Sequence, residues 1–264
     1  MLVKVGGEVV DDAAHLRGLC RNVRALRDGG AFVVVVHGGG PQVTRLQEKL
    51  GQKANKVAGQ RVTGADDIGA VVSALCGTVN VAVVAALKAC GVAAFGGHGA
   101  SVIRAHKRPP VDVAGHGVVD YGEVGDVDGV DAAPLLALCA AGHVPVIATL
   151  GLEPSTGRVL NINGDTAAAA VARALPAAQV MLVTAVGGVF RDLKDPTSRL
   201  STLTTTTARA AIADGTIAGG MIPKVEEALS LLSIVDRVAI VAAYDDGAFV
   251  DVIGGGDRGT VFSP

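Results

Sequence analysis

The sequence has no tryptophan, and aromatic residues make up only 3% of its 264 positions. Neither sign of charge dominates, because 23 Lys and Arg stand against 25 Asp and Glu, which gives a formal net charge of −2 at pH 7. A nucleic-acid partner is not expected, since its phosphate backbone requires a basic surface. Half of the residues are hydrophobic, which excludes a disordered chain and predicts a large buried core.

Cysteine is also sparse. The four cysteines are far apart and form no paired spacing, which excludes a zinc or disulfide framework and is typical of a reducing compartment. No apolar run approaches the ~18 residues of a membrane helix without a glycine or a charge. The first apolar stretch is too short for a signal peptide. We therefore expect a cytoplasmic α/β protein with no membrane partner.

Short apolar runs recur along the chain, several of them followed by glycines, and segments of helical period lie between them. Continuous runs of this length are typical of parallel strands buried on both faces. Repetition of strand and helix predicts a doubly wound α/β sheet. Strands are expected at 2–5, 31–36, 144–148, 180–184 and 238–242, and helices at 11–28, 41–51, 66–89, 131–141, 165–175, 206–213 and 222–233.

Three regions stand out from this pattern. The segment 66–89 is apolar nearly all round, so we expect it at the centre of the fold or at a subunit contact. Residues 92–130 are rich in Gly, Pro and His, which indicates a lobe of hairpins over the sheet. The turn-rich stretch 150–160 predicts the division between two halves, 1–155 and 156–264.

Several common catalytic and binding motifs are absent. The sequence has no Walker phosphate loop and no G-x-S-x-G nucleophile motif. The glycines at 254–259 match a dinucleotide fingerprint by letters, but too few residues follow them to form the helix that would bind a pyrophosphate. His98, His106 and His116 lack the spacing of a zinc site, so they are expected to be exposed loop histidines. No protein-held metal is predicted.

Glycine clusters and isolated lysines remain as the candidates for chemistry. Lys4 lies within an apolar strand just before Gly6 and Gly7. Burial of a lysine there costs free energy unless its ammonium reaches an anion or the strand is a solvent-facing edge strand. Glycines 38–40 follow the strongest strand, and their backbone N–H groups can crowd against an anion. Asp165 opens one helix and Lys224 lies in the first turn of another. Two lysines, a glycine cradle and a carboxylate form a set suited to phosphoryl transfer.

Five motifs in this order resemble the amino acid kinase family. They are KVGG at 4–7, VHGGGPQ at 36–42, RVT at 61–63, NINGDTAA at 161–168 and GGMIPKV at 219–225. The resemblance implies a three-layer αβα sandwich with a central, mainly parallel sheet. It also implies that residues 1–155 form an N-terminal lobe for substrate binding and dimerisation, and that residues 156–264 form a C-terminal lobe for ATP.

Within the family, the motifs are most similar to those of members that use ATP to phosphorylate the side-chain carboxylate of N-acetyl-L-glutamate in arginine biosynthesis. Such a nucleophile is already ionised at pH 7 and needs no general base. The resemblance assigns catalysis to Lys4, Lys224 and Asp165, with Asp165 holding both lysines. Gly39, Gly40, Arg61, Asn161 and Asn163 would bind the substrate. Gly6, Gly7, Thr184, Gly187 and Gly188 would bind the nucleotide, and ATP would carry Mg²⁺.

From the residues alone, Arg61 could instead form a surface salt bridge, the two asparagines could serve only turns and helix caps, and Lys224 could be a solvated helix lysine. The chain also departs from the family pattern in its final segment, 238–264, where VAAYDDG replaces an HIIDGR-like sequence, and in two loops. Ala100-Ser101 replaces a Lys-Asp pair, for which His98 could substitute, and Ala185 replaces an aspartate, leaving the nucleotide contacts there to Thr184 and the backbone. These changes leave two other functions open, a kinase for N-acetyl- or carrier-linked aminoadipate in lysine biosynthesis and a catalytically silent nucleotide or amino-acid sensor.

The sequence begins directly at its first strand. In this family, hexamers inhibited by arginine carry a further N-terminal helix, so the resemblance implies a homodimer.

Overall fold

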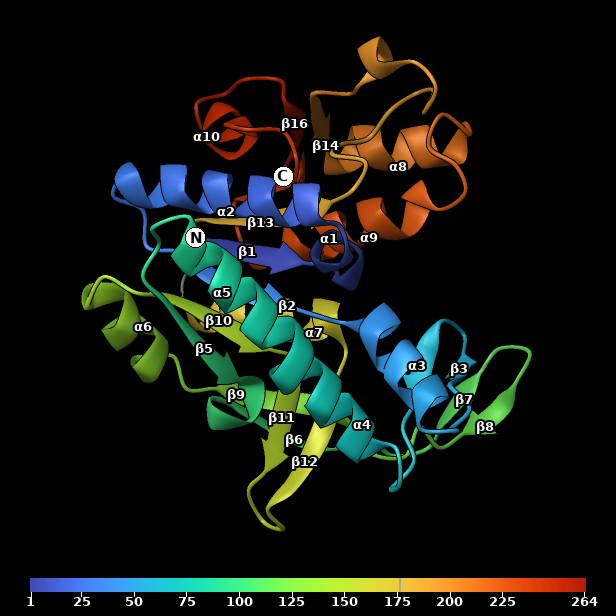
Figure 1. Ribbon diagram of the computed structural model, residues 1–264. Helices are drawn as coiled ribbons and strands as arrows, with labels where there is room; N and C mark the ends of the chain where they lie inside the picture. The colour runs from blue at the N-terminus through green and yellow to red at the C-terminus, as the bar shows by residue number, and fades with distance from the viewer. Residues whose placement is uncertain (176) are drawn as a thin grey trace.

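The computed structural model describes residues 1–175 and 177–264, and its central feature is an eight-stranded sheet (Figure 1). The strand order is β14-β16-β15-β13-β1-β2-β10-β5. All neighbours are parallel except β15 and β16. The strands are β1 (Leu2–Val5), β2 (Val34–His37), β5 (Ala94–His98), β10 (Val144–Ala148), β13 (Gln179–Thr184), β14 (Thr202–Thr204), β15 (Arg237–Ala242) and β16 (Gly259–Ser263). The mainly parallel sheet predicted from the apolar runs is confirmed.

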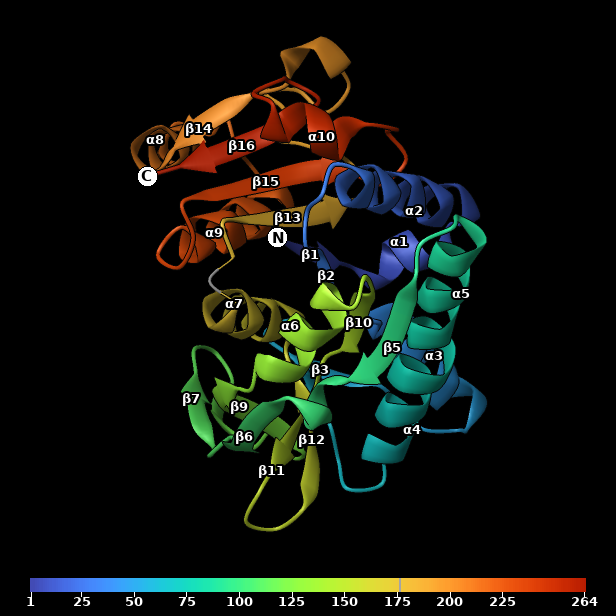
Figure 2. The same ribbon diagram turned by 90° about the vertical axis from the view of Figure 1, so that its left-hand side faces the viewer.

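Helices cover both faces of this sheet, as Figure 2 shows. One face packs against α1 (Gly7–Asp11), α2 (Ala13–Asp28), α5 (Val81–Ala89) and α10 (Ala248–Ile253). The other face packs against α6 (Ala133–Ala140), α7 (Gly164–Ala174), α8 (Thr205–Ala213) and α9 (Met221–Leu231). Two separate hydrophobic cores result, one on each side of the sheet, and the expected three-layer αβα sandwich is confirmed.

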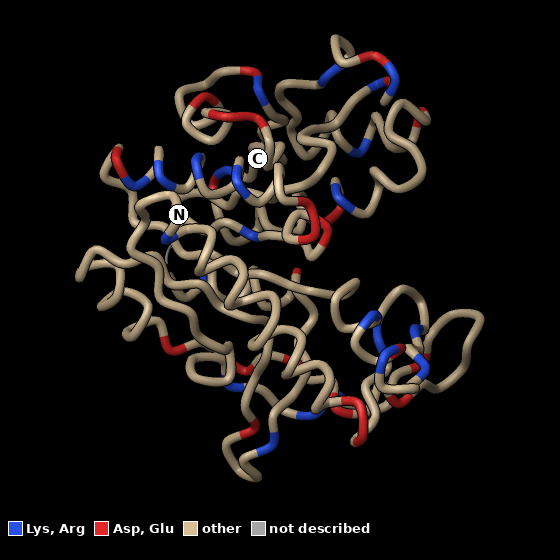
Figure 3. Tube along the Cα trace, in the orientation of Figure 1, with Lys and Arg blue, Asp and Glu red and all other residues tan. Residues whose placement is uncertain are grey.

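The predicted helix 66–89 is one continuous run of three parts, α4 (Ile68–Val72), a π-helical segment (Ser73–Asn80) and α5. The run is long and apolar enough to cross a membrane by length and composition alone. Figure 3 shows it almost free of charge, and Lys88 is its one charged residue. In this fold it packs against α2, β5, β10 and α3 (Gly40–Lys49), so it forms part of the α/β sandwich.

Below the sheet lies a small barrel of four strands, β6 (Ile103–Lys107), β9 (Val124–Val130), β11 (Leu150–Glu153) and β12 (Arg158–Ile162). Two hairpins accompany it, β3 (Asn55–Val57) with β4 (Gln60–Val62) and β7 (Val111–Val113) with β8 (Gly117–Val119). The lobe of hairpins predicted at 92–130 is found at 103–130, in β6, β7, β8 and β9, whereas residues 94–98 form the edge strand β5 of the central sheet. The break predicted at 150–160 is the turn of the β11–β12 hairpin.

The sheet brings the two halves of the chain together along one line. The strands β14, β16, β15 and β13 come from the second half, β1, β2, β10 and β5 come from the first, and β1 pairs with β13 at the junction. Because β1, β2 and β13 are parallel, the glycine-rich turns after them meet at the same edge of the sheet. In open α/β sheets, this carboxyl edge is where ligands bind.

Candidate active site

Lys4 lies at the centre of the sheet, in β1 between β13 and β2. Side chains alternate along a strand, so Val3 and Val5 enter the core beneath α2 while Lys4 faces α7 and α9 on the other side. Its Nζ lies 2.7 Å from Oδ1 of Asp165 and 2.9 Å from Oε1 of Glu227. The alternative of a solvent-facing edge-strand lysine is wrong, because β1 is an inner strand and only 18% of this side chain is exposed.

The charges in this cluster are strongly interdependent. Burial alone would lower the pKa of the Lys4 ammonium, but the charges of Glu227 and Asp165, and their hydrogen bonds to it, raise that pKa above its ordinary value. Burial raises the pKa of Glu227, opposed by Lys4 and reinforced by the nearby Asp165. Lys4 is therefore held as a cation between two carboxyl groups at neutral pH.

Lys224 reaches the same place from the first turn of α9. A cavity of about 50 Å³ lies at the end of β1 and β13 and is lined by both lysines together with Gly6, Thr184 and Glu227. The two lysines, distant in sequence, thus share one cavity. In the part of the chain that the structure describes, Asp165 pairs with Lys4, and no ion pair joins it to Lys224.

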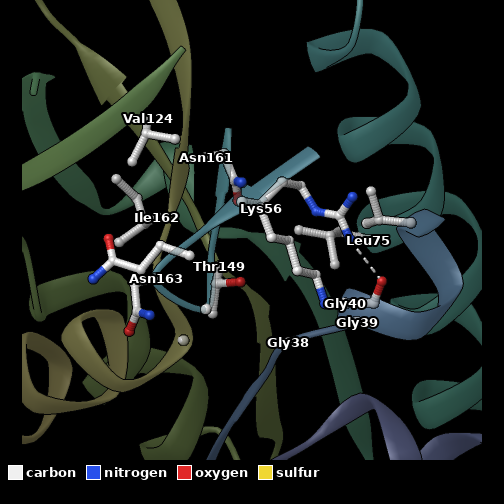
Figure 4. A pocket seen from close by; sticks show the side chains of 15 residues that line it. Gly38, Gly39, Gly40, Lys56, Leu75, Val124, Thr149, Asn161, Ile162 and Asn163 are labelled. Atoms are coloured by element: carbon white, nitrogen blue, oxygen red, sulfur yellow. Dashed lines mark hydrogen bonds between the residues drawn. The ribbon is translucent and has the colours of Figure 1, made fainter. Parts of the chain in front are cut away.

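A larger cavity of about 200 Å³ lies beside this cluster, between the β2–α3 turn and the start of α7 (Figure 4). All five residues predicted for substrate binding line it, namely Gly39, Gly40, Arg61, Asn161 and Asn163. Gly164 lines the cavity too, and a Cβ atom at Gly164 would lie 4.0 Å from Cε of Lys4. The larger cavity therefore extends to Gly164, next to the side chain of Lys4.

Arg61 is held against the first turn of α3. Its Nη2 donates to the carbonyl of Gly40 at 2.9 Å and to Oγ1 of Thr44 at 2.7 Å, and its Nη1 donates to Gln47. Burial lowers the pKa of Arg61, with a smaller opposing effect from Asp67. Among the described residues no carboxylate forms an ion pair with it, so the surface salt bridge considered as its alternative is not found. A half-buried guanidinium on the wall of a cavity, with no ion pair to a carboxylate among the described residues, is suited to an anion.

The two asparagines are oriented by hydrogen bonds, Asn161 to a side chain and Asn163 to the backbone. Nδ2 of Asn161 donates to Oγ1 of Thr63 at 3.0 Å, which leaves its carbonyl oxygen without a protein partner among the contacts described. Oδ1 of Asn163 accepts from the backbone N–H groups of Asp165 and Thr166 and caps α7. The capping alternative is therefore present for Asn163, which at the same time lines the cavity.

Glycine is required where the loops approach one another. A Cβ atom at Gly39 would lie 2.6 Å from Cδ2 of Leu75, and one at Gly7 would lie 3.0 Å from the Cα atom of Gly39. On the other side of the site, the backbone N–H of Gly187 donates to Oγ1 of Thr184. Gly187 has a φ of +78°, and its Cβ would lie 2.4 Å from that of Ala242. The predicted nucleotide residues Thr184, Gly187 and Gly188 thus form one tight turn after β13.

A buried histidine contacts the glycine-rich turn that follows β2. His37 is fully buried, and its Nε2 accepts from Nδ2 of Asn80 at 2.9 Å. Its Nδ1 then carries the hydrogen and donates to the carbonyl of Gly38 at 2.9 Å. Burial lowers the pKa of His37 to about 4, so it is neutral at pH 7. This fixed imidazole orients the first residue of the glycine cradle.

Two residues of the site are absent from the sequence-based set. Glu227 lies three residues after Lys224, so helical periodicity could have placed the two side chains on the same face of the helix. Lys56 lies opposite Arg61 across the β3–β4 hairpin, and Figure 4 shows its side chain extending toward the Gly39–Gly40 turn. His98, by contrast, lies with Cys76 and Asn80 in a separate cavity beside α5 and does not line the cavity of Arg61.

Comparison with known proteins gives matches along most of the chain. A sequence model described as the amino acid kinase family matches residues 1–242. The acetylglutamate kinase of Sorangium cellulosum is 45% identical over 270 residues, which cover 100% of this chain and 94% of that protein. The acetylglutamate kinase of Anaeromyxobacter sp. strain Fw109-5 is 43% identical, with 99% and 98% covered. The solved structure of Giardia carbamate kinase has a similar fold, with a TM-score of 0.67 at 17% identity over 100% of this chain and 98% of that one.

Proposed function

The chain belongs to the amino acid kinase family, and we propose that it phosphorylates the side-chain carboxylate of N-acetyl-L-glutamate with ATP, as a step of arginine biosynthesis. A carboxylate oxygen attacks the γ-phosphorus of ATP. The bond from that phosphorus to the oxygen bridging the β- and γ-phosphates breaks, and ADP leaves with the electron pair. The products are N-acetyl-L-glutamyl 5-phosphate and ADP, and no proton has to be removed from the nucleophile.

The single observation that carries this function is the position of Lys4 between two cavities. Lys4 and Lys224 line the smaller cavity, and Gly164, which approaches Lys4, lines the larger one with Arg61. The reaction must bring an anionic acceptor to an anionic triphosphate, so positive charge is needed where the two meet. Lys4 would stabilise the transferring phosphoryl group, and Lys224 would stabilise the oxygen of the departing ADP. Asp165 would keep Lys4 oriented.

The larger cavity suits an N-acylated acidic amino acid. Arg61 would bind the α-carboxylate, because its planar guanidinium matches a carboxylate and has no protein counter-ion in the contacts above. Asn161 and Asn163 would contact the same end of the substrate. The backbone N–H groups of Gly39 and Gly40, at the start of α3, would face the end where charge develops during transfer.

The smaller cavity, of about 50 Å³, would take the reacting end of the triphosphate, and the turn after β13 would lie beside the rest of the nucleotide. Gly6 and Gly7 would supply backbone donors to the phosphates, and Thr184, Gly187 and Gly188 would contact the rest of ATP. The described residues contain no group of three potential metal ligands from His, Cys, Asp and Glu. Mg²⁺ would therefore be held mainly by the triphosphate, where it neutralises phosphate charge. On this view residues 1–155 carry most of the substrate site and residues 156–264 most of the ATP site.

An assay of two acids tests the proposal. ADP release is followed with N-acetyl-L-glutamate and with N-acetyl-L-aminoadipate, and the acyl phosphate is trapped with hydroxylamine. We expect turnover and trapping with N-acetyl-L-glutamate. Turnover on the longer acid alone would assign the chain to the aminoadipate reaction, although one methylene changes affinity by only ~1–3 kcal/mol. Nucleotide binding without turnover on either acid would contradict the proposal and leave a silent sensor or a kinase of carrier-linked aminoadipate.

A homodimer is proposed from the edge of the sheet at β5. This edge strand has no partner beyond it among the described strands, and Phe95 within it is 52% exposed. Val81 of the neighbouring α5 is 59% exposed on a helix with almost no charge. Unpaired edges and exposed apolar residues favour association. We place the dimer in the cytoplasm, in keeping with four free cysteines among the described residues.

A further inference from the structure

The Lys4 ammonium is anchored from two helices rather than one. Asp165 approaches it from the first turn of α7 at 2.7 Å, and Glu227 approaches it from α9 at 2.9 Å. Glu227 is the more buried of the two carboxylates, with 13% of its side chain exposed against 52% for Asp165. We propose that Glu227 is a positioning residue that, together with Asp165, fixes the direction of the Lys4 ammonium during phosphoryl transfer. The proposal rests on the proposed kinase function.

The number of hydrogens on the ammonium supports this role. A lysine ammonium has three N–H donors and no acceptor. Two of them are occupied by Asp165 and Glu227, which leaves one to point toward a ligand. A lysine is a point charge on a flexible four-carbon stem, so one anchor would leave it free to swing. Two anchors from separate elements restrict the third hydrogen to one direction.

The position of Glu227 separates it from an ordinary helix carboxylate. It lies on the same face of α9 as Lys224, one turn later, and lines the small cavity with both lysines. It also lines a groove of about 450 Å³ between α7 and α9. It therefore forms part of the wall between the lysine cavity and that groove. Its neighbour Glu226 is exposed on the outer side of the helix and offers a matched control.

The pH dependence of the reaction follows from this arrangement. Protonation of Glu227 would remove a charged anchor from Lys4, and its pKa is raised by burial. The charged groups around it on β1, α1, α7 and α9 are Lys4, Glu8, Asp165, Arg173 and Lys224. Since Asp165 also raises the pKa of Glu227, this group takes up a proton at a higher pH than an ordinary glutamate. The rate should fall on the acid side as Glu227 is protonated.

The test compares Glu227→Ala, Glu227→Gln and the control Glu226→Ala in the full chain, with kcat, both KM values, pH profiles and melting temperatures. Glu227→Ala should lower kcat about tenfold, the effect of one charge-assisted hydrogen bond, with the KM for N-acetyl-L-glutamate little changed. Glu227→Gln, which keeps an acceptor oxygen but lacks the charge, as protonated Glu227 does, should have a kcat between those of Glu227→Ala and the unchanged protein and should lose the acid limb of the profile. Glu226→Ala should match the unchanged protein.

Two results would overturn the proposal. One is an unchanged kcat in Glu227→Ala. The other is an equal loss of kcat in both Glu227 variants, accompanied by a lower melting temperature and an unchanged acid limb, because that pattern indicates packing alone. If the unchanged protein turns over neither acid, the proposed function fails, and NMR titration of the Lys4 ammonium still decides the contact. The pKa of Lys4 should fall in Glu227→Gln, and an unchanged pKa would exclude the anchoring role.

Discussion

Lys56 and Arg61 lie directly opposite each other across the β3–β4 hairpin, and both line the larger cavity, which extends to Gly164 beside Lys4. The pair arises from a tight turn at Ala58 and Gly59, which both have positive φ values. Two like charges opposite each other on a hairpin are unfavourable. An acidic substrate bound between the hairpin and α3 would offset this repulsion, so the cost is consistent with a binding role.

Arg61→Ala should therefore weaken substrate use much more than it affects folding. The variant loses a charge-assisted hydrogen bond to the α-carboxylate, so kcat/KM for N-acetyl-L-glutamate should fall about 10- to 100-fold, mainly through KM. Steady-state kinetics measures this fall in kcat/KM for Arg61→Ala. The same measurement is made on Lys56→Ala, and on Lys53→Ala as the control outside this cavity. An unchanged KM in Arg61→Ala would contradict the assignment of the α-carboxylate.

Gly187→Ala should damage both stability and nucleotide binding. Its φ of +78° strains any side chain, and its Cβ would collide with Ala242 on β15. Gly255 has a similar φ of +88° but open space around it, so Gly255→Ala isolates the strain of about 1–2 kcal/mol. Urea unfolding should show a larger loss for Gly187→Ala, and ATP binding should weaken in that variant only. Equal losses of unfolding free energy in the two variants would show that the contact with Ala242 on β15 does not contribute to stability.

His37 should remain neutral well into the acid range. Its pKa is lowered to about 4 by burial, so the unfolded chain takes up the proton first, at its ordinary pKa near 6.5. Stability associated with this residue is therefore lost as the pH falls from about 6.5 to 4. NMR titration of the imidazole checks the midpoint, with the same titration in concentrated urea as the reference. A midpoint near 6.5 in the folded protein would contradict the buried network with Asn80.

Phe95→Glu should separate the proposed homodimer into monomers. A charge on the exposed edge strand β5 would have to be buried without a partner in the interface. Sedimentation should give the unchanged protein twice the chain mass of 26.3 kDa, and the variant a single chain mass. Phe32 is similarly exposed, at 56%, but lies before β2, so Phe32→Glu should stay dimeric. Dissociation by both substitutions would argue against an interface at β5.

The inner strands were predictable because they are continuous apolar runs. The run VPVIA forms β10 at the predicted residues, and VMLVT forms β13 within one residue of them. The edge strand β5 and the barrel strand β9 were not predicted, since AFGGH and VGDVDGV mix glycine and charge with few apolar residues. Such strands are specified by their neighbours in the sheet rather than by local composition.

The residues of the candidate site also divide into those that the sequence indicates and those whose position depends on packing. Lys4, Asp165 and Arg61 lie in motifs that can be found in the sequence, and the structure brings Lys4 to Asp165 and Arg61 to the adjoining cavity. Glu227 could not be linked to Lys4, because that contact depends on how α9 packs against the sheet, where it contacts β15. Lys56 depends on the register of a short hairpin, which the sequence alone does not fix.

The most direct measurement is the turnover of N-acetyl-L-glutamate by Lys4→Ala, with Lys4→Arg and the melting temperatures measured alongside. Removal of the ammonium should lower kcat about 10²-fold or more while the protein still folds and binds ATP. Lys4→Arg keeps the charge and should recover part of the rate. A folded Lys4→Ala protein that turns over N-acetyl-L-glutamate at the unchanged rate would contradict the account.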